Sequence, residues 1–340
     1  MLIKSKVKNY HVHFEKELIL EYDFYIIDKN VYRLHKSKFN LNSNKLLLVD
    51  ANECSKTYLK CHDYLQKLIE LGVKRGQTIC AIGGGIIQDI AGFITSILYR
   101  GVDWVFYPTT LLAQCDSCIG GKTSINFGAY KNLVGNFNPP VQIFVNLEFL
   151  ETLDHRDIMS GIGEIIKVAF LDNFTSIKTS ELQNAITNGN VERNLIDKAL
   201  QIKKRFIEVD EFDKGVRNLM NYGHTFGHAI ETITKHQVPH GIAVGLGIYI
   251  ANQVSKKLLN IKFKNQDEGI INLFVEKNNQ HWQRFKSEFN ASDYLNILMK
   301  DKKNVNLKEI CCILKINNDT FSKKNIDKNV LTNCLSEIMR

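Results

Sequence analysis

The sequence lacks the marks of several protein classes. No apolar run is long enough to span a bilayer, so we expect no membrane segment. The first eleven residues contain no apolar stretch of the kind found in secretory signals. No arginine-rich run with interleaved aromatic residues occurs, which argues against a nucleic-acid partner although the net charge is +8. These absences favour a cytoplasmic protein with no membrane or nucleic-acid partner.

The eight cysteines do not form an evident framework. They are scattered and mostly lie in apolar segments, which is typical of reduced thiols in the cytosol. Cys115 and Cys118 have the CxxC spacing, but no second pair follows. We therefore favour interpreting them as two small, semi-buried residues of a loop.

What is present indicates a globular protein with a sizeable core. The 340 residues suffice for two domains, and 44% of them are hydrophobic and 24% charged. In the first half, short β-branched runs alternate with helical patterns, which predicts a doubly wound parallel sheet. The second half is predicted to be helical. The expected strands are residues 24–28, 45–50, 78–82 and 102–107, and the expected helices of the first half are 56–71 and 86–98.

Three consecutive glycines, Gly83 to Gly85, stand between a predicted strand and a predicted helix. Without Cβ atoms the backbone can approach a pyrophosphate closely, and the helix N-terminus offers unpaired N–H groups. The run is not the usual GxGxxG pattern, so a tight structural turn is an equally good interpretation. Asp28, at the end of an earlier strand, suits either a ribose hydroxyl or the cap of a turn.

A glycine-rich segment follows at residues 111–126, with a second short stretch at 131–135. Lys122, Lys131, Asn126 and Asn132 offer many hydrogen-bond donors, which suits a polyanionic or polyhydroxyl ligand. The excess positive charge of the chain also suits a phosphorylated, acidic substrate. Because apolar runs flank the segment, we expect a buried loop rather than a solvated one.

Glu164 and Lys167 lie three residues apart on an otherwise apolar helix, for which Ser160 is the expected N-cap. A carboxylate in that setting is costly unless it is paired or bound to a metal. The alternative is an ion pair at the surface, which the apolar surroundings disfavour.

His224 and His228 share one helical face, and His240 opens a second helix after a predicted helix end at residues 235–239. Three histidines so placed suit a divalent metal if a carboxylate joins them. For the histidine pair alone, capping, core or surface positions are an equally good interpretation.

Seven motifs occur in one order over roughly residues 20–305, and together they are highly specific. With these motifs the sequence resembles 3-dehydroquinate synthases and, more broadly, the sugar-phosphate cyclases. The matching stretches are residues 83–93 (GGGIIQDIAGF), 100–102 (RGV), 108–123 (PTTLLAQCDSCIGGKT), 131–135 (KNLVG), 163–167 (GEIIK), 221–231 (NYGHTFGHAIE) and 240–241 (HG).

The resemblance implies an N-terminal Rossmann-like domain with a doubly wound parallel sheet, residues 1–155, which holds NAD. It also implies a C-terminal all-α domain, residues 156–340, which holds a divalent metal, usually zinc, with cobalt also suitable. A homodimer is a further family expectation.

The resemblance also implies the roles of individual residues. Glu164, His224 and His240 would be the metal ligands, and His228 would be an outer or acid–base histidine, which corrects the three-histidine set. Arg100 would reach the substrate phosphate, within the chain or across a dimer interface, and Lys302 or Lys303 would close the site. The other residues around the substrate would be Asp116, Lys122, Lys131, Asn132, Lys167, Lys203, Arg217 and Asn221. NAD would be held by Asp28, Asn30, Glu53, Lys56, Gly84, Gly85, Ile86, Asp89, Thr109, Thr110, Asp116, Ser117, Lys122, Lys131, Phe149 and Thr152.

The implied reaction is that of a carbon–oxygen lyase of the shikimate pathway, which leads to aromatic amino acids. A seven-carbon keto-acid phosphate is oxidised by NAD, loses phosphate by β-elimination, is reduced again, and closes by an aldol addition to 3-dehydroquinate. The metal would act as a Lewis acid, and lysines and Arg217 would balance the substrate charges.

Four positions depart from the family pattern. Ile242 replaces a glutamate after His240-Gly, Cys118 replaces a serine, Gln88 replaces a glycine, and Asn317 follows Ile316 in place of glycine. These changes leave open a paralogous cyclase that makes an inosose- or valiolone-type product. A metal-dependent polyol dehydrogenase and a binding protein without turnover are the remaining alternatives.

Overall fold

The computed structural model describes residues 1–128, 130–300 and 308–339 of the chain. The chain forms two compact units, one of Met1–Asp154 with Lys204–Phe212 and one of His155–Lys203 with Asp213–Arg340. The boundary after Asp154 lies one residue from the domain boundary expected after residue 155. The expected division has one boundary only and does not include the second segment of the first unit, Lys204–Phe212.

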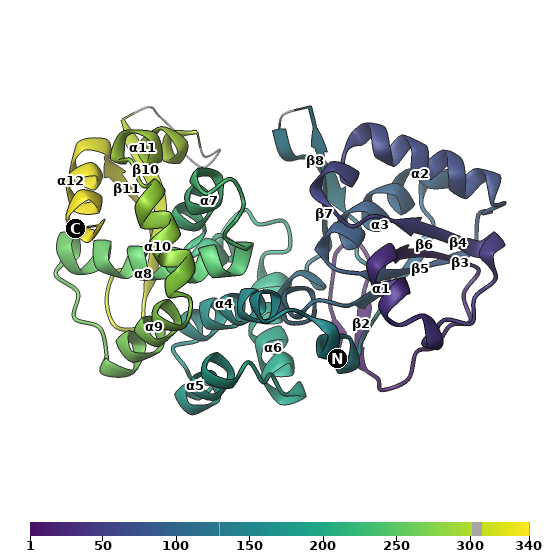
Figure 1. The fold of residues 1–340 in the computed structure, drawn as a ribbon, viewed down its shortest axis with the longest axis horizontal. Helices are drawn as coiled ribbons and strands as arrows, with labels where there is room; N and C mark the ends of the chain where they lie inside the picture. Colours follow the sequence, from purple (N-terminus) through teal and green to yellow (C-terminus); the bar gives the residue numbers. More distant parts are fainter. Residues whose placement is uncertain (129, 301–307, 340) are drawn as a thin grey trace. The chain divides into compact units, whose positions relative to one another are not determined.

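The first unit is built on a seven-stranded sheet in the order β1-β2-β9-β6-β5-β3-β4. Figure 1 labels β2, β3, β4, β5 and β6 of this sheet. Every neighbouring pair is parallel except β1 and β2. The central strands are apolar on both faces because a parallel sheet of this kind is covered on both sides. All four predicted strands are confirmed. The strands are β1 Leu2–Ile3, β2 Tyr10–Phe14, β3 Phe24–Asp28, β4 Leu46–Val49, β5 Thr78–Gly83, β6 Asp103–Pro108 and β9 Gln142–Val145.

The helices of this unit follow the predicted strands. They are α1 Lys29–Leu34, α2 Tyr58–Glu70 and α3 Gly85–Ile97, with short helical turns at Lys36–Lys38, Ser43–Lys45, Glu53–Ser55, Leu98–Arg100 and Leu147–Thr152. One face of the helix α3 belongs to the hydrophobic core, since Ile87, Ile90 and Ile94 on that face are fully buried. The two helices predicted for the first half are therefore confirmed.

The glycine-rich segment folds differently from the expected buried loop. A π-helical turn at Ala113–Ser117 is followed by an antiparallel ribbon of β7, Lys122–Phe127, and β8, Tyr130–Phe137. The strand β7 buries Thr123 and Ile125, whereas β8 is largely exposed. Of residues 111–126 only Lys122 is exposed, so the expected burial is confirmed there, whereas the stretch 131–135 on β8 is largely exposed.

The second unit is helical, as predicted, with one addition. The described residues also form an antiparallel ribbon of β10, Glu309–Lys315, and β11, Phe321–Asp327, which the sequence pattern did not predict. The helices are α4 His155–Leu171, α5 Thr179–Asn188, α7 His224–Ile233, α8 His240–Leu259, α9 Asn265–Lys277, α10 Asn279–Glu288, α11 Ala291–Met299 and α12 Lys328–Met339, with a short helical turn at Val216–Asn221. The helix α6, Arg193–Val209, begins in this unit, and its residues from Lys204 onward belong to the first.

Glycines let the helices α4, α7 and α8 meet backbone to backbone. A Cβ atom on Gly163 would overlap the carbonyl oxygen of Gly241, and one on Gly247 would overlap that of Gly223. Ser160 does not cap α4 as expected, because that helix already begins at His155. Its hydroxyl instead accepts a hydrogen bond from the backbone N–H of Gly241 at 3.0 Å, which ties α4 to the start of α8.

Two expectations about the whole chain can be compared with the structure. None of the described helices is both long and apolar enough to cross a membrane. Among the described residues no disulfide joins any two of the eight cysteines, and Cys115 and Cys118 are buried.

Candidate metal and dinucleotide sites

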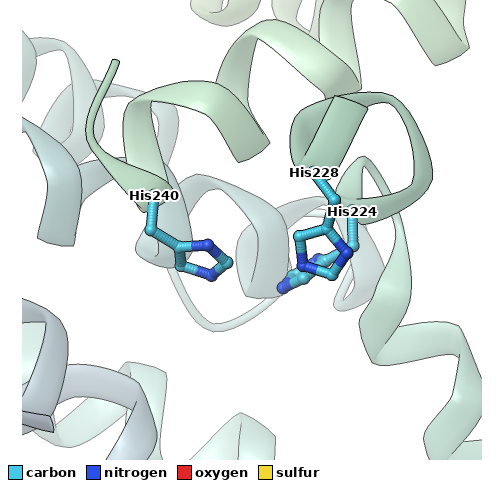
Figure 2. Close-up of side chains that lie close together, drawn as sticks. All are labelled: His224, His228 and His240. Carbon is cyan, nitrogen blue, oxygen red and sulfur yellow. The ribbon is translucent and has the colours of Figure 1, made fainter. Parts of the chain in front are cut away.

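Three side chains from three helices converge in the second unit. Oε1 of Glu164, on α4, lies 3.5 Å from Nε2 of His224 on α7 and 3.3 Å from Nε2 of His240 on α8. Figure 2 shows the rings of His224, His228 and His240 turned toward one another. The glycine contacts explain this convergence, since Gly163, Gly223 and Gly241 each adjoin one of the three residues. One carboxylate and two imidazoles at this spacing are a donor set suited to zinc or cobalt.

The electrostatics of this cluster favour a cation. Burial raises the pKa of Glu164, but Lys167, with which it forms an ion pair, and the two imidazoles hold that pKa well below its ordinary value. Burial lowers the pKa of His224 well below its ordinary value against the attraction of Glu164. Burial also disfavours charge on His240, yet its hydrogen bonds to Glu164 and Glu231 raise its pKa to about 10. The carboxylates of Glu164 and Glu231, which lie against the imidazoles, would favour a positive ion held between these side chains.

The Nδ1 atoms of His224 and His240 also have hydrogen-bond partners. Nδ1 of His240 lies 3.1 Å from Oε2 of Glu231, and Nδ1 of His224 lies 3.4 Å from the carbonyl oxygen of Tyr222. Burial raises the pKa of Glu231, but the hydrogen bond to His240 outweighs it and the net shift is downward. The sequence interpretation overlooked Glu231, although its position seven residues after His224 places it on the same helical face.

His228 lies at the edge of this cluster. Its side chain is exposed, and its ring stands 5.3 Å from that of His224 and 5.7 Å from that of His240. Its nitrogens come close enough to those of the other two histidines for a three-histidine set. Glu164 is nevertheless the buried group that faces both His224 and His240 through a single oxygen.

The other residues predicted to surround the substrate in this unit are mostly buried cations. Lys167, Lys203 and Arg217 are exposed by 2%, 8% and 4%, which is unusual for such side chains and suits an acidic ligand. The Nδ2 group of Asn221 donates to the carbonyl oxygen of Asn218 at 3.0 Å. Lys302 and Lys303 lie outside the described residues.

The triple-glycine run lies in the first unit, where β5 passes into α3. Gly84 is the N-cap of α3, and a Cβ atom on it would come within 2.9 Å of Cγ2 of Thr110. The backbone N–H of Thr109 donates to the carbonyl oxygen of Gly83 at 3.0 Å, which holds the end of β6 beside the turn. Ile86 lies in the first turn of α3. The backbone here can therefore approach a phosphate closely.

Asp28 ends β3 and caps α1. Its carboxylate accepts from the backbone N–H of Asn30 at 2.8 Å, and burial raises its pKa. An open pocket of about 430 Å³ is lined in part by the next two residues, Lys29 and Asn30, and by Asp50. In the helical turn Leu147–Thr152, the hydroxyl of Thr152 hydrogen-bonds Nε2 of His35 at 3.0 Å, and Phe149 is buried.

A buried ion pair joins α3 to the segment before α2. Nζ of Lys56 lies 2.7 Å from Oδ2 of Asp89. Burial raises the pKa of Asp89, and Lys56 offsets part of that rise. The backbone N–H of Ser124, on β7, donates to the other carboxylate oxygen of Asp89 at 2.8 Å. Glu53 lies three residues before Lys56 and bonds the side chain of Asn126.

The remaining predicted residues of this unit lie on the turn and the ribbon. Asp116 and Ser117 belong to the π-helical turn, and Lys122, Lys131 and Asn132 belong to β7 and β8. The two lysines and Asn132 are exposed. Arg100 is also exposed and has a left-handed backbone with φ 65°.

Comparison with known proteins assigns the family. Residues 46–160 match the family model for the N-terminal part of 3-dehydroquinate synthase, and residues 161–304 match the model for its C-terminal part. The chain belongs to the 3-dehydroquinate synthase family. A relative from Endomicrobium trichonymphae named 3-dehydroquinate synthase is 36% identical over 330 residues, which cover 92% of this chain and 89% of the relative.

Solved structures confirm the predicted fold. A 2-deoxy-scyllo-inosose synthase, complexed with carbaglucose-6-phosphate, NAD+ and Co2+, has a TM-score of 0.84 at 22% identity and covers 99% of both chains. A 2-epi-5-epi-valiolone synthase from Streptomyces hygroscopicus with NAD+ and Zn2+ has a TM-score of 0.79 at 21% identity, covering 97% of this chain and 96% of that one. At these identities the likeness shows the fold alone.

The positions that depart from the family pattern have local partners in this chain. The side-chain amide of Gln88 donates to the carbonyl oxygen of Ser117 at 2.7 Å and accepts from the Ser117 hydroxyl at 2.7 Å. Cys118 is buried, with Sγ 3.6 Å from the carbonyl oxygen of Gln114. Ile242 is fully buried in the first turn of α8. Gln88 thus links α3 to the π-helical turn by hydrogen bonds. Ile242 is part of the hydrophobic core.

Proposed function

We propose that this chain is a 3-dehydroquinate synthase, a phosphate-eliminating cyclase that uses NAD and a divalent metal. Its substrate would be a seven-carbon keto-acid phosphate, and the enzyme would act in the shikimate pathway. The observation that carries the proposal is the convergence of Glu164, His224 and His240 in a chain of this family. We also propose a cytoplasmic location, as expected from the sequence, and a homodimer, as the family resemblance implies.

The metal would be held by Glu164, His224 and His240, with zinc the expected ion and cobalt a suitable substitute. The donor set fits, because a buried ionised carboxylate faces the Nε2 atoms of two imidazoles at 3.3–3.5 Å. When bound, the metal supplies Lewis acidity toward the oxygens of the substrate. Glu231 and the Tyr222 carbonyl would hold the two imidazoles in the orientation that presents Nε2.

The dinucleotide would be held in the first unit by the residues predicted from the sequence. The turn at Gly84 fits a pyrophosphate, since any side chain there would meet Thr110. Asp28 and Asn30 would lie at the adenosine end, and Lys56 and Asp89 would hold the ribbon beside the turn. When bound, NAD supplies a reversible hydride acceptor.

The remaining residues would bind and orient the acidic substrate. Lys167, Lys203 and Arg217 offer buried positive charge for its carboxylate and phosphate groups. From the first unit, Lys122, Lys131, Asn132, Asp116 and Arg100 would contribute, as the family resemblance implies. His228, exposed at the edge of the metal cluster, would hold or move a proton at a substrate oxygen.

Release of inorganic phosphate from the seven-carbon keto-acid phosphate, with NAD and zinc present, tests this proposal. We expect steady release by the wild-type chain and a loss of at least about 100-fold in the Glu164→Ala variant. No release by the wild-type chain would overturn the proposal.

A second candidate, a cyclase for another sugar phosphate, is favoured by Ile242 and Cys118, both of which are buried. A panel of hexose and heptulose phosphates in the same assay separates the two, because only the true substrate releases phosphate. Net accumulation of NADH would instead indicate a polyol dehydrogenase, since a cyclase returns the hydride to its substrate.

A further inference from the structure

One buried side chain of the first unit touches two residues with different proposed roles. Asn126, at the end of β7, is exposed by only 6%. Its Nδ2 group donates to Oε1 of Glu53 at 2.7 Å, and its Oδ1 atom accepts from the backbone N–H of Asn132 at 2.9 Å. Glu53 is a proposed dinucleotide contact and Asn132 a proposed substrate contact, so the inference below rests on the proposed function.

A bulge in the ribbon explains why Asn126 reaches both residues. The pairing of β7 with β8 shifts register between Ile125 and Phe127, which leaves Asn126 out of the ladder. Its backbone N–H donates instead to the carbonyl oxygen of Lys56 at 2.8 Å, and it forms an isolated bridge with Thr57. A bulge of this kind redirects a side chain, here toward the segment that carries Glu53.

The backbone of Asn132 needs this support. Its φ of 51° lies in the left-handed region, which asparagine adopts more readily than most residues other than glycine when local hydrogen bonds support it. Oδ1 of Asn126 holds its backbone N–H, and the hydroxyl of Ser124 donates to its side-chain oxygen at 3.1 Å. Ser124 is held in turn by Asp89, the partner of Lys56. The conformation of Asn132 is thus linked through hydrogen bonds to the residues around the dinucleotide site.

We infer that Asn126 is a positioning residue that holds both Glu53 for the dinucleotide and Asn132 for the substrate, through one hydrogen bond to each. The side chain acts through its two neighbours and does not itself contact either ligand. The two polar atoms of the amide have separate roles, since Nδ2 donates to the carboxylate of Glu53 and Oδ1 accepts from the backbone N–H of Asn132. A purely structural residue would not divide its effects in this way.

The two duties can be separated by substitution. Asn126→Asp keeps an acceptor for the N–H of Asn132 but places a second carboxylate oxygen against Glu53. Asn126→Ala removes both hydrogen bonds. Asn136→Ala is the matched control, because this exposed asparagine of the same ribbon bonds the side chains of Thr123 and Ser96, neither of which is a proposed ligand residue.

The test measures NAD affinity by calorimetry, the KM of the seven-carbon substrate, and the unfolding temperature of each full-length variant. We expect Asn126→Asp to weaken NAD binding about tenfold or more, with the substrate KM at saturating NAD within about twofold of wild type. Asn126→Ala should weaken NAD binding and also raise the substrate KM, whereas Asn136→Ala should change neither.

Wild-type NAD affinity in Asn126→Asp would overturn the inference, as would equal losses in NAD affinity and substrate KM in all three variants. If Asn126→Ala does not fold, Asn126→Asp and Asn136→Ala still decide the matter. A wild-type chain that binds no NAD would overturn the proposed function itself, so the two failures are distinguishable.

Discussion

Gly163 of α4 packs directly against the backbone of Gly241 of α8, so closely that a Cβ atom on Gly163 would overlap the Gly241 carbonyl oxygen. Each glycine adjoins a proposed metal ligand, Glu164 in one helix and His240 in the other. The separation of the two helices at this point therefore sets the 3.3 Å distance between Oε1 of Glu164 and Nε2 of His240. The metal site depends on backbone contact as much as on the ligands.

We predict that Gly163→Ala will damage the metal site without touching a ligand. The added methyl group forces α4 and α8 apart, which should lower the free energy of unfolding by about 1–3 kcal/mol. Zinc affinity should fall at least about tenfold, as measured by competition with a chelating dye. Gly269→Ala is the control, because no atom lies within 4 Å of its added Cβ and alanine favours the interior of α9. Equal zinc affinity in Gly163→Ala and wild type would contradict the prediction.

Glu231 gives a second prediction about the same site. Its carboxylate holds Nδ1 of His240 at 3.1 Å, and such an outer partner fixes the orientation of a ligating imidazole. Glu231→Gln keeps the shape but removes the charge, so the affinity for zinc should fall by about 10–100-fold. The visible spectrum of the cobalt-substituted protein should change as well. Glu181→Gln, at an ion pair with Lys198 on other helices, should leave both readings unchanged. An unaltered cobalt spectrum and affinity in Glu231→Gln would refute this role.

A buried ion pair anchors the second ribbon. Nζ of Lys315, on β10, lies 2.5 Å from Oδ2 of Asp267 on α9, and both side chains are almost fully buried. The ammonium group also lies 5.5–5.7 Å from the ring centres of Phe170, Phe263 and Phe321.

We predict that Lys315→Met will lower the free energy of unfolding by about 3–5 kcal/mol, because it leaves the carboxylate of Asp267 buried without a counter-charge. The double variant Lys315→Met with Asp267→Leu should recover most of the loss. Urea denaturation of the wild type, Lys315→Met and the double variant checks this, and a double variant less stable than Lys315→Met would disprove the explanation.

The sequence predicted the elements whose local pattern is strong. The strands β3, β5 and β6 are continuous apolar runs, and the histidines of α7 share a face by helical spacing alone. The sequence pattern did not predict the ribbon of β7 and β8. The strand β8 is exposed and polar, so it lacks an apolar pattern, and its pairing with β7 cannot be deduced from the residues of either strand alone. Two contacts between helices were likewise not predicted, that of Gly163 with Gly241 and that of Glu231 with His240. They depend on how the helices pack, and the spacing of residues within one helix does not determine that packing.

Metal dependence of phosphate release is the most direct test of the central claim, that Glu164, His224 and His240 hold a cation needed for the reaction. The measurement follows phosphate release from the seven-carbon keto-acid phosphate, with NAD present, before chelation, after chelation and after zinc is returned. We predict that release stops on chelation, resumes with zinc or cobalt, and proceeds without net formation of NADH. Release that continues undiminished in the metal-free protein, or that never occurs with metal and NAD supplied, would contradict the account.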